Sequence, residues 1–110
     1  MSGIIKQIES MEDLNAIVQQ SGSKLVIVDF YADWCGPCKR IAPVFEAMVQ
    51  KEFEGKIDAY KVNADEVEEA VDEYEVSGLP TFKFFKNGEN IDVVVGGNED
   101  ELREKIQNYV

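Results

Sequence analysis

Residues 25–38 of the chain have the sequence LVIVDFYADWCGPC. Its first half, residues 25–31, is an almost unbroken apolar run rich in β-branched residues, which predicts a strand covered on both faces, as in a parallel sheet. From Ile41 to Phe53, apolar residues recur at the spacing of an amphipathic helix that ends near Gly55. The two cysteines, Cys35 and Cys38, are therefore expected where a buried strand leads into a helix.

Three further helices are predicted from their capping residues. Ser10, followed three positions on by Asp13, begins a helix near the amino terminus. Asp65 is expected to cap a short helix in the middle of the chain. Asn98 and Glu101 form a capping-box-like start for a last amphipathic helix.

Strand patterns alternate with these helices. Residues 57–62, 81–86 and 91–95 are predicted strands, and Asn87-Gly88 is a two-residue hairpin signal between the last two. The predicted order, β-α-β-α-β-α-β-β-α, also includes a strand before the Ser10 helix and describes a three-layer α/β/α sandwich. Its central sheet should be mixed, parallel in the first part and antiparallel at the hairpin.

Length and composition predict one domain over residues 1–110, with enough apolar residues to need no metal or disulfide for its core. The net charge of -11 argues against nucleic acid or an anionic membrane as a partner, because both would repel the chain. The first residues do not resemble a secretory signal, and no apolar run is long enough to span a bilayer. We therefore expect a cytoplasmic protein, or one in an organelle matrix if a transit peptide has been removed.

The Cys-Gly-Pro-Cys motif places Cys35 at the start of a helix. Unsatisfied backbone N–H groups and the helix dipole favour a negative charge there, and hence the thiolate. Pro37 fits the first turn, where its missing N–H costs nothing. In the predicted mechanism, the Cys35 thiolate attacks a disulfide of another protein, and Cys38 then attacks Cys35 to release the reduced partner.

Two other interpretations of the cysteine pair stay open. Cys-x-x-Cys is a common zinc spacing, but a closed structural site takes four ligands, so only a second chain could complete one here. A purely structural bridge would add little stability over so short a loop. Because Gly36 and Pro37 supply no charge that would stabilise a thiolate, we predict a reducing rather than an oxidising couple.

Asp29 is the charged residue inside the predicted buried strand. Burial without a partner is costly and raises the pKa of a carboxyl group. A carboxyl near neutrality, six residues before Cys35, could take the proton from Cys38 during the second attack. Alternatively, Asp29 points out of an edge strand, or Lys61 neutralises it.

Three segments together closely resemble the thioredoxin family over nearly the whole chain: VDFYADWCGPCK at 28–39, GLPTF at 78–82 and KNGE at 86–89. The resemblance implies a central sheet with helices on both sides and a cis peptide bond before Pro80, facing the cysteines. It also implies that Lys61 pairs with Asp29 and moderates its pKa in catalysis. A client-binding patch around Cys35 would consist of Trp34, Gly36, Pro37, Leu79, Pro80, Gly96 and Gly97.

The function implied by the resemblance is that of a monomeric protein-disulfide reductase without a bound cofactor. Its redox group would be the Cys35–Cys38 disulfide, and NADPH and flavin would act indirectly through a thioredoxin reductase. By resemblance, its clients would include peroxiredoxins, ribonucleotide reductase and methionine sulfoxide reductase. Two rival functions remain: a disulfide isomerase or oxidase domain, which would favour a histidine between the cysteines and a secretory signal, and a binding subunit without redox turnover.

Overall fold

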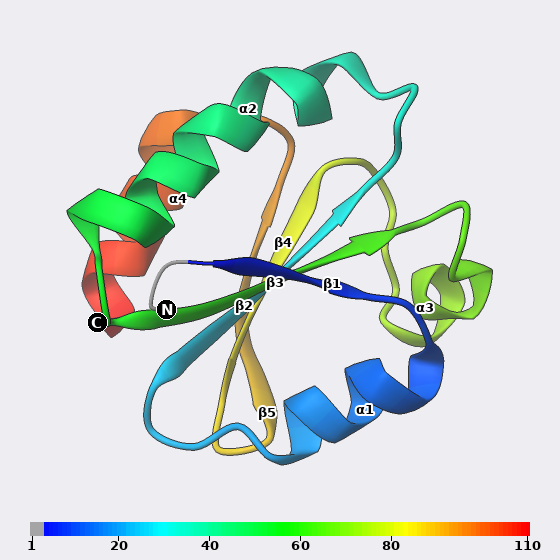
Figure 1. Cartoon of the computed structure of the whole chain (residues 1–110), viewed down its shortest axis with the longest axis horizontal. Helices are drawn as coiled ribbons and strands as arrows, with labels where there is room; N and C mark the ends of the chain where they lie inside the picture. Colours follow the sequence, from blue (N-terminus) through cyan, green and yellow to red (C-terminus); the bar gives the residue numbers. More distant parts are fainter. Residues whose placement is uncertain (1–3) are drawn as a thin grey trace.

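In the computed structural model, which describes residues 4–110, the apolar run forms the central strand of a five-stranded sheet (Figure 1). The strand order is β1-β3-β2-β4-β5. The strands are β1 (Ile5–Ile8), β2 (Leu25–Tyr31), β3 (Ile57–Asn63), β4 (Thr81–Lys86) and β5 (Glu89–Val95). The helices are α1 (Met11–Gln19), α2 (Gly36–Ala47), α3 (Glu68–Glu73) and α4 (Glu99–Tyr109), with a π-helix, η1 (Met48–Glu52), directly after α2.

The sheet is mixed, as predicted. β3 runs parallel to both β1 and β2, whereas β4 is antiparallel to β2 and to β5. Because β2 has a neighbour on each side, the alternative that Asp29 points out of an edge strand is wrong. Six of the seven residues of β2 are buried, which confirms the prediction of a strand covered on both faces.

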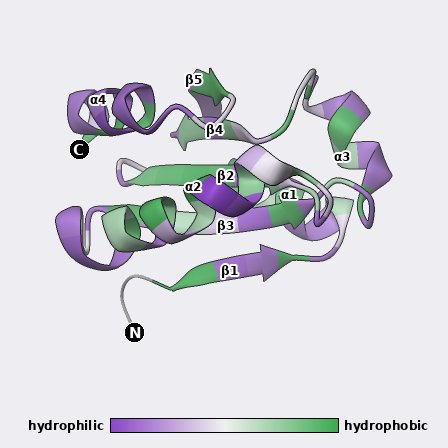
Figure 2. Cartoon of the chain, turned by 90° about the horizontal axis from the view of Figure 1, so that it is seen from above, coloured by the Kyte–Doolittle hydropathy of each residue, from purple (hydrophilic) through white to green (hydrophobic). Residues whose placement is uncertain are grey.

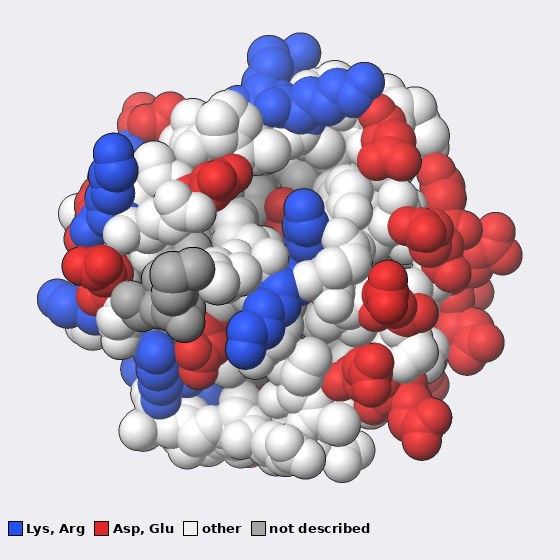
Figure 3. Space-filling view, in the orientation of Figure 1, with Lys and Arg blue, Asp and Glu red and all other residues white. Residues whose placement is uncertain are grey.

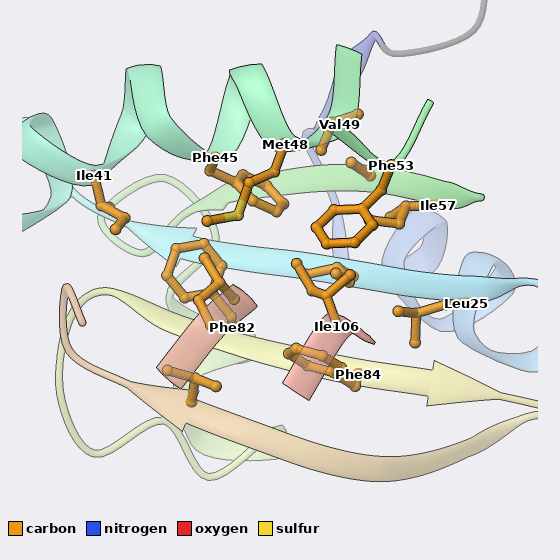
Figure 4. Close-up of a cluster of buried hydrophobic side chains, with 14 residues drawn as sticks. Leu25, Ile41, Phe45, Met48, Val49, Phe53, Ile57, Phe82, Phe84 and Ile106 are labelled. Carbon is orange, nitrogen blue, oxygen red and sulfur yellow. The ribbon is translucent and has the colours of Figure 1, made fainter. Parts of the chain in front are cut away.

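Two hydrophobic layers hold the helices to the sheet. α2 and α4 cover one face, and α1 and α3 cover the other (Figure 1). In the first layer Phe45 of α2 packs edge-on against Phe82 of β4, with the ring centroids 5.0 Å apart (Figure 4). Figure 2 shows the hydrophobic β2 in the middle of these layers and the mostly polar α4 outside. Within residues 4–110, no helix combines the length and the apolar composition needed to cross a membrane.

Two of the three predicted helix caps are confirmed. The side chain of Ser10 accepts a hydrogen bond from the Asp13 backbone N–H at 3.1 Å, and Asn98 accepts one from Glu101 at 3.0 Å. The prediction that Asp65 caps α3 is wrong. The helix begins later, after Val67, because a turn in which Val67 N–H donates to the Asn63 carbonyl comes first.

The other turn predictions agree with the backbone. Asn87 and Gly88 both have positive φ angles, 53° and 79°, as the tight turn between β4 and β5 requires. The long helix predicted up to Gly55 is present as α2 followed by η1, whose Met48 carbonyl accepts from the Phe53 N–H at 2.7 Å. This arrangement leaves the amino-terminal end of α2 beside the end of β2, where the cysteines lie.

Candidate active site

Cys35 is the N-cap residue of α2. Its sulfur accepts a hydrogen bond from the Cys38 backbone N–H at 3.2 Å, and Gly36 and Pro37 occupy the first turn. In this structure Cys35 and Cys38 are joined as a disulfide, with their Cα atoms 5.3 Å apart. The two side chains are 4% and 5% exposed. A thiolate formed at Cys35 on reduction would therefore lie at the positive end of the helix dipole, with a backbone N–H directed at its sulfur.

Three loops meet around the disulfide. Ala32 and the partly buried Leu79 pack against the two cysteines. The Leu79–Pro80 peptide bond is cis, which confirms the expectation from the resemblance. The structure thus brings the loop after β2 together with the loop before β4.

The third loop is the glycine pair after β5. The Gly96 N–H donates to the Pro80 carbonyl at 2.7 Å. A Cβ atom on Gly97 would lie 3.4 Å from the Pro37 carbonyl oxygen, in van der Waals contact with the first turn of α2. These two contacts place both glycines at the disulfide, although they lie about sixty residues further along the chain.

Trp34 projects from this surface. Its side chain is 70% exposed, and its indole Nε1 donates to Asp65 Oδ2 at 2.8 Å. Asp65 thus forms a hydrogen bond with Trp34 and does not cap α3 as predicted. Sequence reasoning missed it, although one signal was present: Trp34 follows β2 and Asp65 follows β3, and the ends of neighbouring parallel strands meet at one edge of a sheet.

Behind the disulfide lies a cavity of about 190 Å³ that Asp29 and Cys38 both line. Asp29 is 8% exposed, and its Oδ1 atom has no hydrogen-bond partner among the described residues. Burial raises the pKa of Asp29 to about 7, against a smaller lowering by the charge of Lys61. A carboxyl with this pKa can hold or release a proton near neutral pH.

Lys61 lies opposite Asp29 in the register of β3 and β2 and lines the same cavity. Its ammonium group, however, lies over the ring of Tyr31, 5.7 Å from the ring centroid. The ion pairs within residues 4–110 do not include one between Lys61 and Asp29. Lys61 therefore lowers the pKa of Asp29 through space without an ion pair. Both the alternative that it neutralises Asp29 and the direct pairing implied by the resemblance are wrong, whereas its moderating effect on the pKa is confirmed.

Comparison with known proteins agrees with this geometry. The family model described as Thioredoxin matches residues 6–108. Thioredoxin 1 of Plasmodium falciparum is 41% identical over 106 residues, which cover 96% of this chain and 98% of that protein.

Solved structures agree as well. The crystal structure of Malassezia sympodialis thioredoxin has a TM-score of 0.89 at 39% identity and covers 97% of this chain and 91% of its own. A chain from a structure on thiol resolution in yeast mitochondrial 1-Cys peroxiredoxin has a TM-score of 0.86 at 28% identity, with 94% of both chains covered. The protein therefore belongs to the thioredoxin family, dithiol–disulfide oxidoreductases whose redox group is a Cys-x-x-Cys pair, here Cys35 and Cys38, and not a bound cofactor.

Proposed function

We propose that this oxidoreductase works as a protein-disulfide reductase in which Cys35 attacks, Cys38 resolves and Asp29 moves the proton. The observation that carries the proposal is the shared cavity behind the disulfide, which both Cys38 and Asp29 line, the Oδ1 atom of Asp29 having no hydrogen-bond partner among residues 4–110. Cys35 is not among the residues that line this cavity, and it packs in the cluster that includes Ala32 and Leu79. The two sulfurs thus have different surroundings, which suits two different roles.

The first step uses the surface side. The Cys35 thiolate attacks one sulfur of a client disulfide, a Cys35–client bond forms, and the other client sulfur leaves as a thiolate that takes up a proton. Trp34, Gly36, Pro37, Leu79, Pro80, Gly96 and Gly97 form the surface on which the client rests. The backbone next to Pro80 can pair with an extended client segment, and the glycines let that segment approach closely.

The second step uses the cavity side. Asp29 accepts the proton of the Cys38 thiol, and the resulting thiolate attacks Cys35. The Cys35–client bond breaks, the Cys35–Cys38 disulfide forms, and the client leaves with both sulfurs reduced. Two electrons have then passed from the protein to the client, and Asp29 returns its proton to solvent.

Regeneration requires an external reductant. A thioredoxin reductase that draws on NADPH through a flavin fits the reducing couple expected for an uncharged Gly36-Pro37 pair. Peroxiredoxins are a suitable client class, because one structural neighbour comes from a 1-Cys peroxiredoxin system. Ribonucleotide reductase and methionine sulfoxide reductase are further candidates. Residues 1–110 would form one domain and act as a monomer. The compartment would be a reducing one, such as the cytoplasm.

A trapping experiment tests the roles of the two cysteines. Cys38→Ser removes the resolving thiol, so clients should remain bound to Cys35 as mixed disulfides that dithiothreitol releases. Cys35→Ser with Cys38→Ser is the matched control and should retain none. Equal trapping by both variants, or insulin reduction that survives Cys35→Ser, would refute the assignment of the nucleophile.

The role of Asp29 is tested by timing the two steps separately. At pH 7, Asp29→Asn should slow the attack of Cys38 on a preformed mixed disulfide while leaving the first attack by Cys35 nearly unchanged. Asp58→Asn, at an exposed position paired with Lys24, is the control for loss of one negative charge. The role is wrong if Asp29→Asn leaves both rates as they are in the native protein.

A further inference from the structure

Three polar side chains form a row across the sheet, on the face that α2 covers. In the register of the parallel strands, Gln7 of β1 lies beside Lys61 of β3, and Lys61 lies beside Asp29 of β2. The next residue of this row, Phe82 of β4, packs in the cluster under α2 and α4. Tyr31, two residues after Asp29 on the same strand, points to the same face.

Specific contacts fix this row. The Tyr31 hydroxyl donates to Gln7 Oε1 at 3.0 Å, and Gln7 Nε2 donates to the Lys61 carbonyl at 3.4 Å. The Lys61 ammonium group then lies over the Tyr31 ring at 5.7 Å from its centroid. A lysine side chain is otherwise flexible, so these contacts select one position for its charge.

We propose that Tyr31, oriented by Gln7, is a positioning residue that holds the Lys61 ammonium group at the cavity shared by Asp29 and Cys38. This inference rests on the proposed function, because it concerns the proton that Asp29 would take from Cys38. The other charged groups that line the cavity are Asp33, from the loop after β2, and Lys39, from α2. Of these groups, Lys61 is the one whose charge lowers the pKa of Asp29.

The consequence is a link between Tyr31 and the pH at which Asp29 can accept a proton. If the Tyr31 ring is removed, Lys61 can swing toward solvent, and its stabilisation of the ionised carboxylate weakens. Below the titration midpoint of Asp29, the ionised fraction should then fall about two- to fivefold, the factor that an exposed cation–π contact contributes to an equilibrium. Burial raises the pKa of Tyr31 above its usual value, so the hydroxyl stays protonated as the donor to Gln7.

The test is a double-mutant cycle read by NMR titration of the isotope-labelled Asp29 carboxyl group. Four proteins are compared: native, Tyr31→Leu, Lys61→Met and the double variant. Tyr31→Leu should raise the Asp29 midpoint in the native background but not in the Lys61→Met background, where no ammonium group remains to be positioned. The proposal is overturned if Tyr31→Leu changes the Asp29 midpoint equally in both backgrounds, because the ring would then act by a route other than Lys61. It is also overturned if Tyr31→Leu changes the midpoint in neither background.

Tyr31→Trp keeps an aromatic face and provides a second variant if Tyr31→Leu does not fold. Its Asp29 midpoint should stay near the native one, whereas a rise as large as that of Lys61→Met would overturn the proposal. The titration requires no turnover, so it separates this inference from the proposed function. If the midpoints follow the cycle but the pH profile of the Cys38 attack does not, the positioning of Lys61 is supported and the proton-transfer role of Asp29 fails.

Discussion

Asp29 combines a cost in stability with the proton-transfer role proposed for it. It occupies the central strand, where its neighbours along the strand are buried and apolar and its Oδ1 atom has no partner among residues 4–110. An apolar side chain would suit this position better on grounds of packing alone. The carboxyl is therefore best explained by the cavity that it shares with Cys38.

A pH-dependent stability follows from the Asp29 pKa of about 7. In the unfolded chain Asp29 ionises near pH 4, so between about pH 4 and pH 7 the folded state holds a proton that the unfolded state has lost. The free energy of unfolding should therefore fall as the pH rises through this window, by up to about 4 kcal/mol from this group. Asp29→Asn should be the more stable protein at pH 8 and lose that advantage at pH 3.

Urea denaturation at the two pH values measures the difference. Asp58→Asn, at an exposed position, should show no comparable gain at pH 8. A constant difference between Asp29→Asn and the native protein from pH 3 to pH 8 would contradict the assignment of the raised pKa to Asp29.

We expect the two residues between the cysteines, Gly36 and Pro37, to decide whether the couple is reducing or oxidising. Pro37→His would place an imidazolium beside the Cys35 thiolate, stabilise the reduced form and make the protein a stronger oxidant. We expect the reduction potential to rise by at least about 30 mV, a tenfold change in the exchange equilibrium. Equilibration with glutathione measures it, and Pro37→Ala controls for the loss of the proline. An unchanged potential in Pro37→His would show that charge at this position does not govern the couple.

Among the elements, α4 is joined to β5 by hydrogen bonds that centre on one carboxylate, in addition to the hydrophobic packing under the helix. Asp92 of β5 accepts hydrogen bonds from Lys105 Nζ at 2.9 Å, Tyr109 Oη at 2.8 Å and the Val93 N–H at 2.8 Å. Burial acts to raise the pKa of Asp92, but these hydrogen bonds lower it below its usual value. The last helix therefore depends on an ionised group at the edge strand.

Asp92→Asn should lower the free energy of unfolding by about 1–2 kcal/mol at pH 7, as expected when hydrogen bonds to a charged group are weakened. Because the folded pKa lies below the unfolded one, the stabilisation is present above the unfolded pKa and lost as the pH falls through the folded one. The two proteins should thus converge in strong acid. Lys24→Met, which removes an exposed ion pair, is the control and should change stability by less than about 1 kcal/mol. If Asp92→Asn lowered the free energy of unfolding equally at acidic pH, the stabilisation could not come from the ionised form of Asp92.

Local signals in the sequence predicted most elements correctly. The apolar run of β2, the Ser10 and Asn98 caps and the Asn87-Gly88 turn each depend on residues a few positions apart, and all are confirmed. The predicted start of α3 was wrong because the Asp65 carboxylate could either cap the helix or accept a hydrogen bond from another side chain. It accepts from Trp34, which lies 31 residues away in the sequence.

In the candidate site, too, the residues marked by local sequence could be predicted and those brought together by distant contacts could not. Cys35, Cys38 and Asp29 could be identified from the motif and from one charge in an apolar strand. The row of Gln7, Tyr31 and Lys61 could not, because it depends on the register between β1, β3 and β2. The cis bond at Pro80 was expected from the resemblance and not from local sequence, since a trans bond is the usual state of proline.

Over the whole molecule, acidic residues outnumber basic ones two to one, 22 against 11. Figure 3 shows acidic side chains gathered over α3 and its surroundings and basic side chains over the beginning of α2, whereas both signs are mixed on the left of the view. Both regions border the end of the sheet where Cys35 lies. The field around the disulfide is therefore uneven, and it should favour approach by a client with a basic rim.

Association with such a client should be faster at low salt. The Debye length falls from about 30 Å at about 0.01 M to about 8 Å at about 0.15 M, so the long-range part of the attraction should be lost over this range. Stopped-flow measurement of the association rate provides the test. Glu68→Gln with Glu69→Gln on α3 should reduce the salt dependence, and a rate that does not change with salt would exclude steering.

The hydrogen bond between Trp34 and Asp65 has a practical consequence. The chain contains one tryptophan, the residue directly before Cys35, and the hydrogen bond to Asp65 holds its indole in one position. Emission excited selectively from tryptophan thus comes from a single residue, one position before the cysteine whose sulfur would change partner in each cycle. We expect that emission to change whenever the disulfide opens or closes, so the intrinsic fluorescence of the unlabelled protein should report the fraction of it that is oxidised.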